Sequence, residues 1–337
     1  MTDPDPVERL RPGMRAVVRH RIAPGPTDPS LTEPSLTDAL GDVVAMDAVT
    51  VSVRTRRGLV VIDRDAVVAA KEVPPRPTRR GAPHLAISMD DLEQVMVEGW
   101  PPLERAELGG WLLRAAAGFT ARANSVLPVG SPGVPLSEAI DRCESWYDER
   151  GLRHAFSLFG PAGFALKDDP LGQELVGRGY EPFNHTVVLT TSTTDLPNEV
   201  PHAVGARVRL EFAPSALWWD AWTGLSGHAS TDTATAQAVM TGSPEQLFAT
   251  LEVGGEVIGI ARVGFARAWA GVSALHVAQG HRRTGVAGQL MGAIADASRA
   301  RGIRSMYVQV AQANSPAQAL YDGLGFSTHH EYRYLGR

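Results

Sequence analysis

A strand, a basic turn with small residues and a helix N-terminus follow one another in the last third of this 337-residue chain. The apolar run from Val272 to Val277 predicts the strand. Apolar residues spaced for one helix face then continue from Val286 until Gly302, a C-terminal stop. The turn between them is Arg282-Arg283-Thr284-Gly285-Val286-Ala287-Gly288. Free backbone N–H groups, the helix dipole and two guanidinium groups favour an anion there, and the small side chains admit a phosphate.

Two common phosphate-binding motifs do not account for this turn. Gly280 and Gly285 have the spacing of a Walker A loop, but Val286 stands where that motif requires lysine. A dinucleotide-binding fingerprint needs three glycines as G-x-G-x-x-G, which the turn does not provide. The sequence therefore predicts a phosphate-bearing ligand of another kind.

The residues around the turn resemble the GNAT superfamily of N-acetyltransferases. The turn matches that family's pyrophosphate loop, Gln/Arg-x-x-Gly-x-Gly/Ala, and it follows a strand of the family's Leu-x-Val type at Leu275-His276-Val277. After a strand over 306–310 comes Asn314-Ser315-Pro316-Ala317-Gln318-Ala319-Leu320-Tyr321-Asp322-Gly323-Leu324-Gly325-Phe326. This stretch is similar to the family's Asn-x-x-Ala-x-x-Leu-Tyr-x-x-x-Gly-Phe. The resemblance covers about 250–334, with the three patterns in the family's order.

The resemblance implies that acetyl-CoA is the co-substrate, that no metal is needed, and that a primary amine attacks the thioester directly. It implies that Leu275, His276 and Val277 line the pantetheine arm, and that Asn314 contacts it from the other side. The pyrophosphate is implied to bind to Arg282, Arg283, Thr284, Gly285, Val286, Ala287 and Gly288. Tyr321 stands where the family has its general acid, and a phenol suits a thiolate leaving group. The alternative for Tyr321 is packing between its apolar neighbours.

The general base and the acceptor stay open at this point. His276, Glu252, Glu256, His228 and a water relay are all candidates for the base. The acceptor is a small molecule, an amino acid such as glutamate, or a protein lysine.

Several other residues are candidates for an acceptor pocket. Trp218 and Trp222 lie one helical repeat apart in a helix beginning near 216, and form either core or an acceptor wall. Residues earlier in the chain that would complete such a pocket are Trp111, Arg114, Asn124 and Ser125.

The elements before the site repeat the order of those within it. Asp169–Tyr180 precedes a strand as Ser315–Phe326 does, which indicates a weak internal duplication with a period of roughly 140 residues. We therefore expect an α/β (α+β) GNAT fold in tandem copies with a mixed central sheet. A degenerate copy is predicted at 84–193, a linker at 194–206, and the acetyl-CoA-binding domain at 207–337. The first copy has Val129–Val134 in place of the basic turn.

Local patterns predict the elements of the first copy. Ser88 with Asp91 has the form of a capping box that begins a helix. Strands are expected at 110–114, 121–125, 155–159 and 186–190, and helices at 136–150 and 171–177.

Residues 1–73 are expected to form a small all-β SH3-like barrel. A turn leading into a strand is predicted within Arg11–Arg19, and short strands at 41–45, 49–55 and 58–62, with a Pro-rich loop at 23–38 and a helical turn at 63–68 before a last strand. A Pro- and Arg-rich linker is predicted at 74–83. The layout also resembles actinobacterial GNAT proteins with a small N-terminal barrel before a tandem region.

Composition and charge restrict the class of protein. Hydrophobic residues make up 44% of the chain without an apolar run of ~18 residues, and no secretory signal opens it, so we expect a cytoplasmic protein without membrane partners. The single cysteine, Cys143, excludes an internal disulfide. A net charge of -5 makes nucleic acid an unfavoured partner.

Two other classes of function stay open beside the enzyme. One is a non-catalytic acyl-CoA-binding sensor or partner-binding module. The other is a nucleic-acid adaptor that uses the barrel and the arginines of the linker. Oligomeric state is not predicted.

Overall fold

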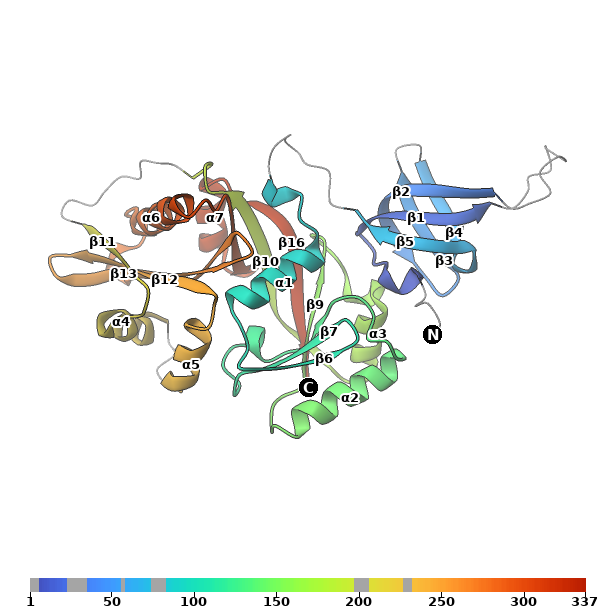
Figure 1. The fold of residues 1–337 in the computed structure, drawn as a ribbon, viewed down its shortest axis with the longest axis horizontal. Helices are drawn as coiled ribbons and strands as arrows, with labels where there is room; N and C mark the ends of the chain where they lie inside the picture. Colours follow the sequence, from blue (N-terminus) through green and yellow to red (C-terminus); the bar gives the residue numbers. More distant parts are fainter. Residues whose placement is uncertain (1–5, 23–34, 56–57, 74–82, 197–205, 227–231) are drawn as a thin grey trace.

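The computed structural model describes residues 6–22, 35–55, 58–73, 83–196, 206–226 and 232–337. They form a small all-β domain at the N-terminus and a larger α/β body, which lie side by side in Figure 1. The predicted linker at 74–83 falls almost wholly outside the described residues.

The N-terminal domain is a five-stranded antiparallel sheet in the order β4-β3-β2-β1-β5. Its strands are β1 (Arg15–Ile22), β2 (Ser35–Met46), β3 (Thr50–Thr55), β4 (Gly58–Asp63) and β5 (Val67–Glu72). Alternate residues such as Val18, Val43 and Val51 are fully buried, as period-2 patterning requires. The predicted loop at 23–38 ends too late, because residues 35–38 pair with β1 through contacts such as Arg19 with Asp38. Its remainder, 23–34, lies outside the described residues.

The larger body is built on an eight-stranded sheet in the order β11-β12-β13-β14-β15-β10-β16-β9. The strands are β9 (Ala155–Gly160), β10 (Glu181–Ser192), β11 (Arg207–Glu211), β12 (Glu245–Val253), β13 (Glu256–Ala266), β14 (Trp269–Val277), β15 (Ser305–Ala311) and β16 (Ser327–Gly336). Only β14 and β15 pair in parallel within it, so the sheet is mixed, as the sequence predicts. A second, antiparallel sheet contains β6 (Glu104–Leu108), β7 (Trp111–Ala115) and β8 (Leu127–Pro128).

Helices cover both faces of the long sheet (Figure 1). They are α1 (Met89–Gly99), α2 (Leu136–Asp148), α3 (Pro170–Gly177), α4 (Ala216–Ser226), α5 (Thr233–Met240), α6 (Val286–Ala300) and α7 (Ser315–Gly323). The predicted cap of α1 is confirmed, because the Asp91 backbone N–H donates to Ser88 Oγ at 3.0 Å. Among the described residues, no helix combines the length and apolar character needed to cross a membrane.

One order of elements occurs twice in the body. The series β6-β7-β8-α2-β9-α3-β10 has the same sequence of strands and helices as β12-β13-β14-α6-β15-α7-β16. We call these series the first half and the second half. The last strand of each half pairs with the other half: β10 lies between β15 and β16, and β16 lies between β10 and β9. The halves are therefore joined through a shared sheet.

One predicted strand is wrong. Residues 121–125 contain a 3-10 turn at Ala121–Ala123. The side chain of Asn124 takes the place of a neighbouring strand as the hydrogen-bond partner of the loop backbone. Asn124 Oδ1 accepts from the N–H groups of Ala116 and Gly118, and its Nδ2 donates to the carbonyls of Phe119 and Thr120. The strand β6, which the sequence reading missed, precedes β7.

Candidate active site

Strands β14 and β15 separate in the middle of the second half. Their parallel pairing runs from Trp269 with Ser305 to Val272 with Val308 and stops there. On its other edge β14 stays paired with β13 as far as Val277, opposite Gly259. Beyond Val272, β14 therefore has a neighbouring strand on one side only. Residues 269–272 are buried, whereas residues 273–277 are half-buried. Backbone groups of β14 between Ser273 and Val277 are available along the open edge.

A β-bulge produces this separation. Between the pairs Ile260 with His276 and Arg262 with Ser273, β14 has one residue more than β13. Ala274 takes up the extra length with a φ of 50°, in the left-handed region. A bulge bends the strand that carries it, which turns β14 away from β15.

The basic turn joins this open edge to α6. Arg282, Arg283 and Thr284 are exposed, and Gly285 is the N-cap of α6 with a φ of 89°, a conformation that favours glycine. No side chain caps the helix, whereas side chains cap the N-termini of α1, α3, α5 and α7. The first N–H groups of α6 thus face the turn with two arginines beside them, which is a geometry suited to an anion.

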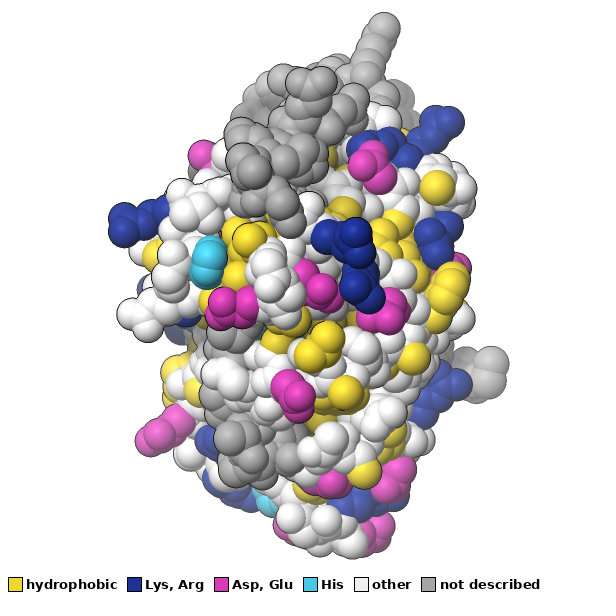
Figure 2. Space-filling model, turned by 90° about the vertical axis from the view of Figure 1, so that its left-hand side faces the viewer, with side chains coloured by type: hydrophobic (Ala, Val, Ile, Leu, Met, Phe, Trp, Pro, Cys, Tyr) yellow, Lys and Arg dark blue, Asp and Glu magenta, His cyan; other side chains and the backbone are white. Residues whose placement is uncertain are grey.

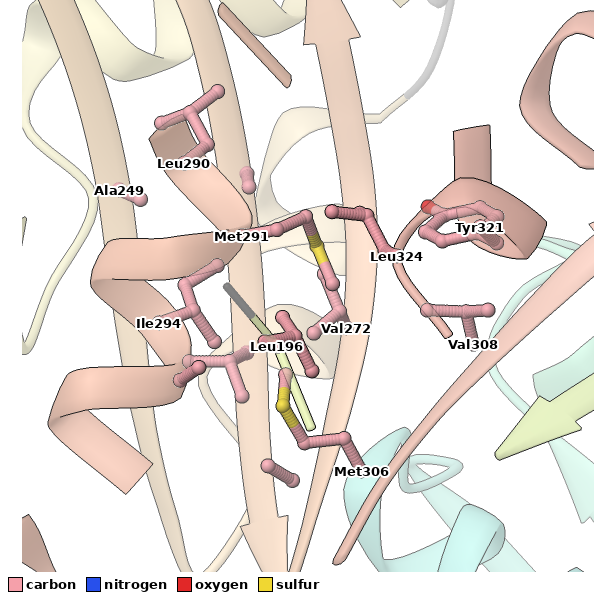
Figure 3. Close-up of a cluster of buried hydrophobic side chains, with 14 of the residues drawn as sticks. Leu196, Ala249, Val272, Leu290, Met291, Ile294, Met306, Val308, Tyr321 and Leu324 are labelled. Atoms are coloured by element: carbon pink, nitrogen blue, oxygen red, sulfur yellow. The ribbon is translucent and has the colours of Figure 1, made fainter. Parts of the chain in front are cut away.

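Asn314 is the N-cap of α7, and Tyr321 lies within the helix. The Tyr321 side chain is 6% exposed, its ring meets Phe326 edge-on at 5.3 Å between centroids, and Figure 3 shows it beside Leu324 and Val308. Among the described residues its hydroxyl has no hydrogen-bond partner. Burial raises the pKa of Tyr321 above its usual value, so the phenol keeps its proton at neutral pH. Asn314 is exposed, and its side-chain oxygen accepts from the Ala317 N–H at 3.2 Å as the cap of α7.

The structure separates the candidates for the base. His276 lies on the open part of β14, opposite Ile260. Glu252 and Glu256 flank the turn of the β12–β13 hairpin, where Gly254 and Gly255 both have positive φ, and Glu252 pairs with Arg209 at 3.5 Å. His228 lies outside the described residues. His276 is therefore the candidate that shares a strand with the site.

Trp218 and Trp222 of α4 belong to the core. Trp218 is fully buried and donates from Nε1 to the Ala261 carbonyl at 3.2 Å, and Trp222 is 2% exposed. Trp222 also meets Phe119 of the first half edge-on, with 6.2 Å between ring centroids. Core packing is the observed role, and it extends across the two halves.

The candidates for the acceptor pocket that come from the first half do not form one group. Trp111 packs in the hydrophobic cluster of the first half. Asn124 is used by its own loop, and Ser125 holds Arg114, whose Nε and Nη2 donate to the Ser125 carbonyl and hydroxyl at 2.9 and 2.8 Å. Arg114 lines a small cavity together with Gln309 and Tyr332 of the second half.

A buried arginine beside the open edge escaped the sequence analysis. Arg262 of β13 is fully buried and donates to the carbonyls of Met240 (2.7 Å) and Gly99 (3.0 Å) and to the hydroxyls of Ser243 (2.6 Å) and Ser273 (3.4 Å). Burial lowers its pKa to about 10, which leaves it charged at neutral pH. The signal for it was a single charge in the apolar strand 257–265.

The N-terminal domain covers the equivalent position of the first half, where it and the loop before α2 line a cavity of about 230 Å³. Its strands β8 and β9 are joined by one parallel bridge, Val126 with Phe156, before they separate. Arg11 enters between them: Nη2 donates to the Pro128 carbonyl at 2.8 Å and Nη1 to the Phe159 carbonyl at 3.3 Å. Its guanidinium also lies 4.6 Å from the centroid of the Phe159 ring. The first half therefore has neither the basic turn nor an open strand edge.

Basic side chains do not dominate the end of the body that contains α4 and α6. Figure 2 shows Lys and Arg side chains interspersed with acidic and hydrophobic ones on this face. Such a mixed surface does not favour a phosphate backbone.

Comparisons with known proteins agree with this geometry. The model of the family described as probable histone acetyltransferase Rv0428c C-terminal matches residues 88–335. The probable histone acetyltransferase Rv0428c of Mycobacterium tuberculosis is 29% identical over 333 residues, which is 96% of this chain and 94% of that protein. The uncharacterized N-acetyltransferase YobR of Bacillus subtilis is 25% identical over 250 residues, 73% of this chain and 98% of its own length.

Solved structures show the same fold. A GCN5-related N-acetyltransferase from Kribbella flavida superimposes with a TM-score of 0.55 at 16% identity, covering 74% of this chain and 96% of its own. The N-terminal domain matches a second family model over residues 10–71, described as the Rv0428c N-terminal Sm-like domain. The small all-β domain is thus confirmed, but its described type is Sm-like and not the SH3-like type that the sequence predicted.

Proposed function

The chain belongs to the family described as probable histone acetyltransferase Rv0428c C-terminal, and on this basis we propose that it transfers acetyl from acetyl-CoA to a primary amine where β14 and β15 separate. The relatives and the fold identify an N-acetyltransferase. The observation that carries the proposal is the open edge of β14 directly ahead of the uncapped N-terminus of α6.

The residues of the second half divide the binding between them. Backbone groups of Leu275 and Val277, with His276 between them, hold the extended pantetheine arm as a strand would. The N–H groups at the start of α6, together with Arg282 and Arg283, bind the pyrophosphate through the helix terminus and charge. Asn314 contacts the arm from the start of α7. The bound acetyl-CoA supplies the acetyl group as an activated thioester.

Tyr321 is proposed as the proton donor to the leaving thiolate. Because burial raises its pKa, the phenol keeps its proton well into the alkaline range in which a larger share of the amine acceptor is neutral. Its hydroxyl, without a partner among the described residues, is available for that transfer. His276 is the side chain placed to assist deprotonation of the amine.

The repeated order of elements supports a tandem arrangement with one cofactor site per chain. We propose the halves at 84–193 and 207–337, after the Sm-like domain within 1–73. The first half lacks the basic turn and holds Arg11 between its separated strands, so it serves as a support and as an acceptor-side wall.

The acceptor is a primary amine whose identity the fold leaves open. The Mycobacterium tuberculosis relative is described as a probable histone acetyltransferase, so a protein lysine is a candidate acceptor beside small amines and amino acids. The competing proposal is an acyl-CoA-binding sensor, which would bind acetyl-CoA without turnover.

A thiol-release assay with acetyl-CoA and a panel of amines separates the two proposals. An enzyme releases free CoA only when an accepted amine is present, and mass spectrometry finds the acetylated amine. A sensor binds acetyl-CoA by calorimetry but releases no thiol with any member of the panel, and that result would refute the proposed function.

A further inference from the structure

A small cavity lies between the two halves, on the face of the sheet opposite α6. Residues from both halves line it, among them Glu93, Trp100, Arg114, Arg122, Gln309 and Tyr332. This central cavity has a volume of about 10 Å³, room for about one water molecule, so a ligand would meet its lining residues at the mouth and would not enter it whole.

Positive charge gathers around this cavity. Arg114 is 4% exposed and Arg122 half-buried, and both line it. The guanidinium groups of Arg122 and Arg262 each lie 5.1 Å from the centroid of the Trp100 ring. In the part of the chain that the structure describes, none of these three arginines forms an ion pair with a carboxylate.

Glu93 offsets only part of this charge. It is the acidic residue among those that line the cavity, and its carboxylate is hydrogen-bonded to His330 Nε2 at 3.0 Å. One carboxylate beside three guanidinium groups leaves a net positive charge around the cavity. An anionic group would offset it, because buried charges are stabilised by opposite charges and hydrogen bonds.

Arg122 differs from the other two arginines in what holds it. Arg114 is bonded to Ser125, and Arg262 to backbone carbonyls and hydroxyls. The guanidinium of Arg122 has the Trp100 ring as its neighbour and no hydrogen bond to any described residue. Its donors are therefore available to a ligand.

The central cavity adjoins the proposed site of acetyl transfer. Gln309, which lines it, directly follows Val308, the last residue of β15 that pairs with β14. From the other strand, Ser273 directly follows Val272 and accepts from Arg262 at 3.4 Å. Gln309, beside one boundary of the strand separation, thus lines the same cavity as Arg114 and Arg122, and Ser273, beside the other, is hydrogen-bonded to Arg262.

We propose that the acceptor carries a carboxylate close to its reacting amine, and that Arg122 binds this carboxylate at the central cavity. The inference rests on the proposed function and names its substrate class, the amino carboxylates. The first half then takes a direct part in the reaction, because Arg122 binds the carboxylate of the acceptor while the second half binds acetyl-CoA. A planar carboxylate matches the paired donors of a guanidinium.

Matched acceptors test this inference. Leucine, glutamate and lysine are each compared with their α-carboxamides, and a lysine peptide without a free carboxylate near its amine is included. Rates are expressed per concentration of neutral amine, because an amide lowers the basicity of the neighbouring amine. The wild-type chain should prefer the carboxylate member of at least one pair by about ten- to a hundredfold in kcat/KM, the effect expected for a charge-assisted hydrogen bond.

Three variants complete the design. Arg122→Ala should reduce this preference to less than about threefold, mainly through KM, and Arg122→Lys should restore part of it. Arg142→Ala removes an exposed arginine that pairs with Glu138 on α2, and it should keep the full preference. Thermal unfolding verifies that each variant is folded.

The possible outcomes are distinct. Equal use of acids and amides, a preference for the lysine peptide, or an unchanged preference in Arg122→Ala would overturn this inference and leave the proposed function standing. Absence of turnover with every acceptor would overturn both.

Discussion

Val272 of β14 and Val308 of β15 form the last parallel pair between their strands, and the positive φ of Ala274 two residues later turns β14 away. This one relationship opens a strand edge in the middle of an otherwise continuous sheet. The turn from Arg282 to Gly285 and the uncapped N-terminus of α6 lie at the end of the same strand. A thioester arm and a pyrophosphate can therefore be held by one strand and the helix that follows it.

Replacement of Tyr321 by phenylalanine should lower kcat about a hundredfold or more, because positioned proton donors contribute that much. The ring stays in its cluster with Phe326, so the Kd for acetyl-CoA should change less than about twofold. Steady-state kinetics and calorimetry measure the two effects. Tyr180→Phe is the control, since it removes a buried hydroxyl bonded to Glu144 in the first half. A Tyr321→Phe variant with full kcat would mean that Tyr321 serves only in packing.

The pH profile provides a second test of Tyr321. Burial raises its pKa, so the neutral, donating form persists where a free tyrosine would start to ionise. We expect kcat for a good acceptor to hold steady up to about pH 9.5 in the absence of unfolding. A fall of kcat above about pH 8.5 that Tyr321→Phe abolishes would contradict the raised pKa.

Stability should depend on pH through Glu72, at the end of β5. Burial first, and then the carboxylate of Asp90, raise the pKa of Glu72 from 4.5 to about 7. The folded state thus binds the proton more tightly than the unfolded state. This contribution to stability is complete below pH 4.5 and is lost as the pH rises through about 7.

The variant Glu72→Gln removes this dependence. It should raise the free energy of unfolding at pH 8 by ~1–2 kcal/mol, discounted for partial exposure, and have little effect at pH 4.5. Urea unfolding at several pH values measures the effect, with the exposed Glu107→Gln as control. A variant that is less stable at pH 8 than the wild type would contradict the assignment.

Arg11→Ala should loosen the N-terminal domain from the first half without creating a second acetyl-CoA site. Loss of two hydrogen bonds to buried carbonyls and of the contact with Phe159 should cost about 1–3 kcal/mol. Differential scanning calorimetry detects this loss as a lower Tm. Arg19→Ala, which breaks an exposed ion pair with Asp38, should leave the Tm nearly unchanged. If Arg11→Ala bound two acetyl-CoA molecules per chain, the first half would be a blocked cofactor site and not a support.

The local elements were largely predictable from the sequence. Ser88, Gly285 and Gly302 mark helix boundaries by their type, and the structure ends or begins a helix at each of them. The prediction of a strand at 121–125 was wrong because a single asparagine, Asn124, holds that segment as a loop through four hydrogen bonds. Side-chain bonds of this kind leave no periodic pattern in the sequence.

Long-range relationships were not predictable in the same way. The alternation of apolar residues indicates that 186–190 is a strand, but it does not say that β10 pairs with β15 instead of β9. The same holds for Arg11, Arg122 and Arg262, whose neighbours come from distant segments. For Arg262 a single charge among apolar residues was the only signal, and it does not reveal a partner.

The most direct test of the account is titration of the wild-type chain with acetyl-CoA by calorimetry. We predict one molecule bound per chain, with binding lost in Gly285→Glu, because a carboxylate at the helix N-terminus repels the pyrophosphate. The control Gly177→Glu adds the same charge where an added Cβ meets nothing within 4 Å, and it should bind normally. The double variant Arg282→Ala/Arg283→Ala keeps the glycine at its φ of 89° and should weaken binding about tenfold or more. No binding by the wild type, or undiminished binding by a folded Gly285→Glu variant, would contradict the assignment of this turn as the acetyl-CoA site.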